Sequence, residues 1–186
     1  MFYKTNFLKL AILAATFGFF TFSCKEENPS PNEENELITT IRLRLTDATG
    51  ASFSAVWKDL TPNDEAGRTI DTLFLNDSTQ YAGTVEFLDE SKNPALDLTG
   101  EIQNESKDHL VVYKPVLPLT TDNFELTRTD RDPNNLEIGL TYSLKTKLAG
   151  KGKIRVILRH QPSEKNGTEA PGDTDVDVEF PVQIRP

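Results

Sequence analysis

The chain has 186 residues, with 29 aspartates and glutamates against 20 lysines and arginines, and a net charge of −9. An acidic protein is repelled by phosphate backbones and anionic lipid head groups, so the charge argues against nucleic-acid binding and against electrostatic attachment to a membrane. The length suits one ordinary domain and a leader segment, and a single cysteine leaves no partner for an internal disulfide.

The first 24 residues have the layout of an export signal. Two lysines give a positive start, residues 10–22 form an apolar run, and Ser23 precedes the only cysteine, Cys24. The run is too short for a membrane-spanning helix and has the length expected of a secretory signal. The pattern resembles a bacterial lipoprotein signal, which implies that Cys24 becomes the lipid-anchored first residue of the mature protein. A buried, unreactive thiol is the alternative, but it does not explain a cysteine that closes an apolar run.

Residues 25–36, KEENPSPNEENE, are predicted to form a flexible tether, because so polar a segment buries too little surface to offset the entropy of ordering it. The lysine and two glutamates at its start resemble the signal that directs Bacteroidota lipoproteins to the outer face of the outer membrane. A generic solubilising linker is the alternative. The predicted organisation is a signal peptide at 1–23, a lipidated cysteine and tether at 24–36, and one domain at 37–186.

From residue 37 onward, apolar and polar residues alternate, which is the pattern of half-buried β-strands. The alternation predicts strands over 40–46, 53–58, 70–75, 80–88, 109–113, 123–128, 136–144, 153–160 and 173–184. At most a short helix is expected within 95–107, and Trp57 is expected in the core. The predicted fold is an all-β, antiparallel β-sandwich of immunoglobulin-like type with seven to nine strands, and a small closed barrel is the alternative.

One local group of side chains has the chemistry of a metal site. Glu105, Asp108 and His109 lie within five positions, and His160, the only other histidine, ends a later strand. If the fold brings His160 beside His109, two ring nitrogens and one or two carboxylate oxygens form a site for zinc or a similar divalent metal. The alternative is an ordinary acidic loop with a histidine at its edge, because the spacing matches no metal-binding signature. No other cofactor is indicated.

The last two strands carry opposite charges, which are expected to pair across the strands on the solvent face. The residues are Lys153, Arg155 and Arg159 on one strand, and Asp173, Asp175, Asp177 and Glu179 on the other. Arg42 and Arg44 of the first strand are expected to flank the same acidic row.

Between these two strands lies the longest predicted loop, residues 161–172, QPSEKNGTEAPG. Loops of this length without secondary structure are often binding elements carried on a rigid scaffold, or else are merely mobile. Gln161, Lys165, Asn166 and Gly167 are therefore candidate binding residues, next to His160 in the chain.

Six segments spread over most of residues 37–186 carry a resemblance: TIRLRLTDATG, WKDL, YAGTVEFLDESKNPALDLTGEI, DHLVVY, RVILRHQP and TDVDVEFPV. Together they resemble a small, largely uncharacterised family of Bacteroidota outer-membrane lipoproteins. The resemblance implies a lipid-anchored outer-membrane protein associated with TonB-dependent receptor systems. It brings no catalytic motif with it.

Two function classes remain after this reading. The expected one is a non-enzymatic binding module on the outer membrane, at the cell surface or alternatively on the periplasmic face, that captures a ligand or metal for a TonB-dependent transporter. The alternative is a cell-surface adhesion or structural module that binds a protein or glycan. An enzyme is not expected, because the G-x-S-x-G, H-E-x-x-H and P-loop motifs are absent from the sequence.

Overall fold

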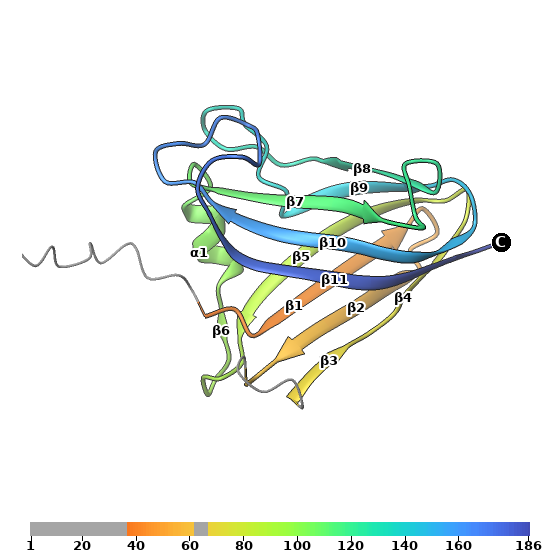
Figure 1. Ribbon diagram of the computed structural model, residues 1–186, viewed down its shortest axis with the longest axis horizontal. Helices are drawn as coiled ribbons and strands as arrows, with labels where there is room; N and C mark the ends of the chain where they lie inside the picture. Colours follow the sequence, from red (N-terminus) through yellow and green to blue (C-terminus); the bar gives the residue numbers. More distant parts are fainter. Residues whose placement is uncertain (1–36, 62–66) are drawn as a thin grey trace, which may run out of the picture. The chain divides into compact units, whose positions relative to one another are not determined.

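The computed structural model describes residues 37–61 and 67–186, which form two β-sheets and one short helix joined by loops (Figure 1). In chain order the elements are β1 (Thr40–Asp47), β2 (Ser52–Asp59), β3 (Arg68–Ile70), β4 (Leu73–Asn76), β5 (Gln80–Asp89), β6 (Leu96–Asp97), α1 (Thr99–Asn104), β7 (His109–Val116), β8 (Phe124–Arg128), β9 (Thr141–Thr146), β10 (Gly150–His160) and β11 (Asp173–Arg185). No helix in this part of the chain has the length and apolar character needed to cross a membrane.

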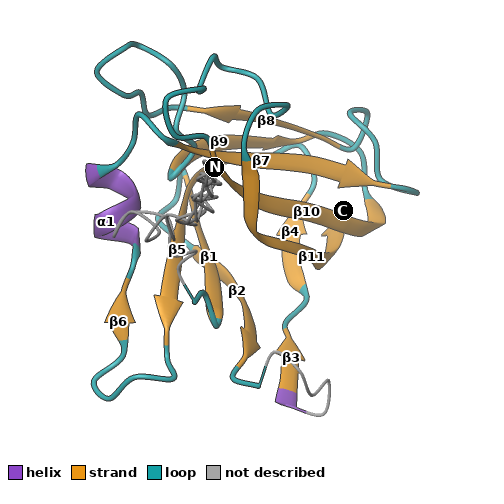
Figure 2. Cartoon of the chain, turned by 60° about the vertical axis from the view of Figure 1, so that its left-hand side comes forward, coloured by secondary structure: helices purple, strands orange, loops and turns teal. Residues whose placement is uncertain are grey.

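The two sheets face each other as layers, with α1 at one end (Figures 1 and 2). The larger sheet has the strand order β3-β2-β1-β5-β9-β8, with β6 beside β5, and the smaller has the order β4-β11-β10-β7. Every pairing is antiparallel except that of β4 with β11. The predicted all-β sandwich and the short helix within 95–107 are thus confirmed, whereas the immunoglobulin-like assignment stays a prediction.

Two predicted strands differ from the observed ones. The predicted strand 70–75 is divided, because β3 pairs with β2 in the larger sheet and β4 pairs with β11 in the smaller one. The predicted strand 136–144 begins only at Thr141, because the side chain of Asp130 accepts hydrogen bonds from the backbone N–H groups of residues 139–141. The alternating pattern therefore located the apolar positions correctly but not the partners of their backbone groups.

The core lies between the sheets and is filled by the inward-facing residues of the alternating strands. Its largest fully buried side chains include Tyr81, Phe87 and Phe180, which come from both layers. Trp57 belongs to the same cluster and is 9% exposed, as expected for a core residue. Sandwich packing of this kind buries one face of each sheet, which accounts for the period-two pattern of the sequence.

The predicted charge pairing between β10 and β11 is present on the solvent face for Lys153 and Arg155. Arg159 instead donates to the hydroxyl of Thr174 and to the carbonyls of Pro171 and Gly172. Lys153 Nζ lies 2.8 Å from Glu179 Oε2, and Arg155 Nε donates to Asp177 Oδ1 at 2.7 Å. The prediction for Arg42 and Arg44 is wrong, because β1 lies between β2 and β5 in the other sheet. Both arginines pair instead with Glu86 of β5, at 2.7 and 2.8 Å.

Candidate metal centre

The register of the smaller sheet brings the two histidines together. His109 begins β7, His160 ends β10, and the antiparallel pairing sets them directly opposite each other. Since side chains alternate across a strand, both rings lie on the inner face with Val111 and Leu158, which belong to the core. The imidazoles stack, with their centroids 4.8 Å apart and their planes inclined by 10°. The fold therefore brings His160 beside His109, as a metal site at these residues requires.

A third donor, Asp175, comes from an irregularity in β11. Leu158 pairs with Val176 and Arg159 pairs with Thr174, so Asp175 has no partner on β10 and forms a β-bulge. Without the extra residue, Asp175 would share the solvent face with Asp177, as the sequence pattern predicts. A bulge re-aims side chains. The carboxylate of Asp175 therefore points to the histidine side and is only 4% exposed.

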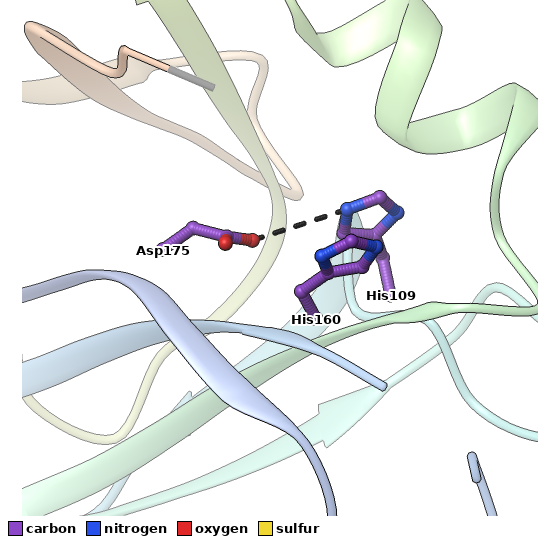
Figure 3. Close-up of side chains that lie close together, drawn as sticks. All are labelled: His109, His160 and Asp175. Atoms are coloured by element: carbon purple, nitrogen blue, oxygen red, sulfur yellow. Dashed lines mark ion pairs between the residues drawn. The ribbon is translucent and has the colours of Figure 1, made fainter. Parts of the chain in front are cut away.

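The three side chains gather tightly at the end of the smaller sheet (Figure 3). His109 Nε2 lies 3.9 Å from Asp175 Oδ2, and one donor atom from each of His109, His160 and Asp175 lies within 4.8 Å of the other two. Donor atoms around a tetrahedral zinc ion lie roughly 3.3 Å apart, as follows from metal–ligand bonds of about 2.0–2.2 Å. Binding an ion thus requires the donors to draw together by about 1 Å and the stacked rings to tilt.

The surroundings of His109 leave its Nε2 available to bind a metal. Its Nδ1 lies 3.2 Å from the carbonyl oxygen of Glu105, which can only accept, so Nδ1 carries the proton and Nε2 carries the lone pair. Burial lowers the pKa of His109, the positive charges of His160 and Lys165 act in the same direction, and the Glu105 carbonyl opposes them. At neutral pH the ring is therefore neutral, which is the state that binds metals.

Asp175 is buried without compensation. Burial raises the pKa of Asp175 to about 6, against the opposing effects of His160 and Arg159. Its Oδ1 is fully buried and has no hydrogen-bond partner among the described residues. A buried carboxylate oxygen of this kind normally has a partner, so the position is costly for the fold alone and suits a bound cation.

Two of the four predicted ligands do not contribute their carboxylates. The side chain of Glu105 is exposed, and only its backbone carbonyl contacts His109. Asp108 holds the long loop, because its Oδ1 accepts a hydrogen bond from Ser163 N at 3.2 Å and its carbonyl accepts one from Gln161 N at 2.6 Å. Asp175 was not among the predicted ligands, because the period-two pattern placed it on the solvent face and nothing in the local sequence marks the bulge.

The candidate binding residues of the 161–172 loop make contacts within the protein itself. Gln161 is buried, and its Nε2 donates to the carbonyls of Thr168 and Pro171. Lys165 is 2% exposed and forms an ion pair with Asp132 at 3.1 Å. The remaining two act locally, since Asn166 Oδ1 accepts from Thr168 N and Gly167 adopts a φ of +85°. These contacts give the loop a defined conformation of its own.

The donor set favours a transition metal over calcium. Two imidazole nitrogens and one carboxylate oxygen suit zinc and its first-row neighbours, whereas calcium requires six to eight oxygen ligands. The side chains come from β7, β10 and β11, so the fold itself holds them in place. The arrangement is therefore able to bind one divalent ion by three protein ligands.

The uncompensated burial of Asp175 predicts an effect on stability. Because the pKa of Asp175 in the folded state lies above the unfolded value of 3.8, folding favours the protonated acid. This contribution to stability is complete below about pH 4 and is lost as the pH rises through about 6. In metal-free protein at pH 8, Asp175→Asn is thus expected to raise the free energy of unfolding by about 1–3 kcal/mol. Urea unfolding with a chelator present measures this gain, which should vanish near pH 4. A less stable Asn variant at pH 8 would contradict this account of the site.

Comparison with protein-family models, with curated proteins and with solved structures finds no match for this chain. The assignments of residues 1–23 as a signal peptide, of Cys24 as the lipidated residue and of 25–36 as a tether lie outside the described residues. They remain predictions from the sequence.

Proposed function

We propose that this protein is a lipid-anchored, non-enzymatic binding module of the outer membrane that captures a divalent transition metal through His109, His160 and Asp175. The anchor in this proposal is Cys24, and the metal is destined for a TonB-dependent transporter, as the resemblance to Bacteroidota lipoproteins suggests. The resemblance also favours an outward-facing location. These parts of the proposal rest on sequence patterns and the metal site rests on geometry.

One observation carries the metal-binding part. Three potential ligands from three strands converge, and a β-bulge is needed to bring the third of them, Asp175, to the site. A fold gains nothing from turning a carboxylate inward and leaving one of its oxygens without a partner. A cation between Asp175 and the two imidazoles supplies the missing interaction, and the Glu105 carbonyl behind His109 is the outer support that metal-binding histidines commonly have.

Thermal unfolding of the full chain, purified in detergent and treated with a chelator, tests this function. Zinc added at about 100 times its dissociation constant stabilises the folded state by about 2.7 kcal/mol, which raises the midpoint by roughly 5–11 °C for a domain of this size. His109→Ala and His160→Ala are each expected to abolish most of this shift, because each removes one of three ligands.

Glu105→Gln is the matched control, since this carboxylate lies near His109 in the sequence but makes no contact with the ring. It should respond to zinc as the unaltered protein does. The proposal fails if zinc, cobalt and copper all leave the midpoint unchanged. It also fails if His160→Ala retains the full zinc shift, because the ion would then be bound elsewhere.

A further inference from the structure

The cluster supplies fewer ligands than a closed zinc site requires. Structural zinc ions have four protein ligands, whereas sites with three leave a position for water or another molecule. Among residues 37–61 and 67–186, no further histidine, cysteine, aspartate or glutamate joins His109, His160 and Asp175. A bound ion is thus left with an incomplete coordination shell.

Three neighbouring acidic side chains, Glu105, Asp108 and Asp173, do not join the three donors. Asp108 is held by the backbone of the 161–172 loop, and the side chain of Glu105 is exposed beyond the ring of His109. Asp173 lies opposite His160 in the strand pairing and so on the same side of the sheet, but its side chain is exposed and does not join the three donors. None of these three carboxylates belongs to the group of donors that lie close together in the structure.

The site is also accessible from outside. The side chains of His109 and Asp175 are buried, but His160 is the last residue of β10 and is only partly covered. Figure 1 shows that β7 and β11 begin, and β10 ends, at the same end of the two layers, next to α1. The ion therefore lies at the rim of the sandwich, where a second molecule can approach it.

The charge of the site indicates which donor the second molecule offers. Two neutral imidazoles and one carboxylate leave a divalent ion with a net charge of +1 in surroundings of low polarity, so an anionic fourth ligand is favoured over a neutral one. Water bound to zinc loses a proton near neutral pH for the same reason.

We propose that the bound ion keeps one exchangeable position for an anionic donor, and that the partner which receives the ion enters through a carboxylate or thiolate at this position. This inference rests on the proposed function. A three-ligand site releases its ion through an intermediate in which donor and acceptor proteins share the metal, whereas a closed four-ligand site must first lose a ligand of its own.

The start of β1 lies at the same end of the domain as the start of β7 (Figure 1). The 13 residues from Cys24 to Glu36 span at most about 45 Å when fully extended. If Cys24 is lipidated, this length limits how far the start of the domain can lie from the bilayer. A partner embedded in the same membrane is within reach of the ion.

Visible absorption of the full chain loaded with cobalt(II), which reports coordination number and ligand type, tests the inference with azide as the anionic probe. A saturable change of the cobalt bands on addition of azide is expected, with the ion remaining bound. Acetate and 2-mercaptoethanol then distinguish the donors, because only a thiolate adds an intense near-ultraviolet charge-transfer band. Glu105→Gln serves again as the control and should behave as the unaltered protein.

The outcomes separate the two proposals. A loaded protein whose spectrum ignores azide, acetate and the thiol has a closed shell, which overturns the open position and leaves metal capture standing. Failure of the protein to bind cobalt or zinc at all overturns the proposed function itself. Release of cobalt by azide without a spectrum of the mixed complex also overturns the inference, since the anion would then compete with the protein ligands.

Discussion

Lys165→Ala is expected to destabilise the domain by about 3–5 kcal/mol and to lower its melting temperature by roughly 6–20 °C. The side chains of Lys165 and Asp132 are 2% and 0% exposed, and Lys165 Nζ also donates to the Ser106 carbonyl at 2.7 Å. Removal of the ammonium leaves a buried carboxylate without its countercharge, which costs more than the loss of a surface ion pair. Thermal and urea unfolding measure the effect.

Two further variants make this prediction specific. Lys165→Met combined with Asp132→Asn should be less destabilised than Lys165→Ala alone, because no unpaired charge then remains buried. Lys151→Ala, at an exposed position of β10, should change the stability little. If Lys165→Ala lowers the stability as little as Lys151→Ala does, the ion pair between Lys165 and Asp132 does not stabilise the domain.

The same ion pair predicts a pH dependence. Burial raises the pKa of Asp132, but the N–H group of Leu136, the ammonium of Lys165 and the N–H group of Asn134 outweigh this effect and lower the pKa below 3.8. The contribution of the pair is therefore complete above about pH 4 and is lost as the pH falls through the folded-state pKa. The stability difference between the unaltered protein and Lys165→Ala should be constant near neutral pH and should narrow below pH 4.

Asp130→Ala is expected to cost about 3–5 kcal/mol, because it leaves three backbone donors without an acceptor. Asp130 Oδ1 accepts from Gly139 N at 2.7 Å, and Oδ2 accepts from Leu140 N at 2.9 Å and Thr141 N at 3.2 Å. Gly139 and Leu140 are buried, so water cannot replace the carboxylate there without disturbing the core.

Asp130→Asn is the matched control, since it retains one acceptor oxygen in nearly the same shape and should recover part of the loss. Urea unfolding ranks the three proteins. Equal stability of Asp130→Ala and Asp130→Asn would show that the hydrogen bonds contribute little. The measurement also bears on the fold, because these bonds set the start of β9 at Thr141.

Both predictions concern a segment that the sequence presents as an ordinary polar turn. Residues 129–135, TDRDPNN, contain the expected proline and asparagines, and the structure does place a turn there. The side chains of Asp130 and Asp132 nevertheless bind backbone groups of residues 134–141, and Asp132 also holds Lys165 of the distant loop. An aspartate that organises its surroundings and a solvated one look alike in a sequence, because the difference lies in which groups reach it.

The candidate site shows the same division. His109 and His160 were predicted as ligands because imidazole is a common metal ligand. Their adjacency, however, depends on the register of β7 with β10. Glu105 and Asp108 were predicted because they are near His109 in the chain. The side chain of Glu105 is exposed, however, and that of Asp108 accepts a hydrogen bond from the 161–172 loop. Asp175 was placed on the wrong face, because a bulge shifts every prediction of facing by one residue.

Side-chain alternation predicted most of the strands, the two-layer β architecture and most of the inward-facing residues, because it is a local property with a period of two residues. The charge pattern also predicted the pairs of Lys153 with Glu179 and of Arg155 with Asp177, because β10 and β11 follow each other in the chain. Contacts between distant parts of the chain place β1 beside β5, put β3 and β4 in different sheets, and bring Asp175 to the histidines. These outcomes depend on the free energy of packing and hydrogen bonding between residues far apart in the chain, which no local pattern records.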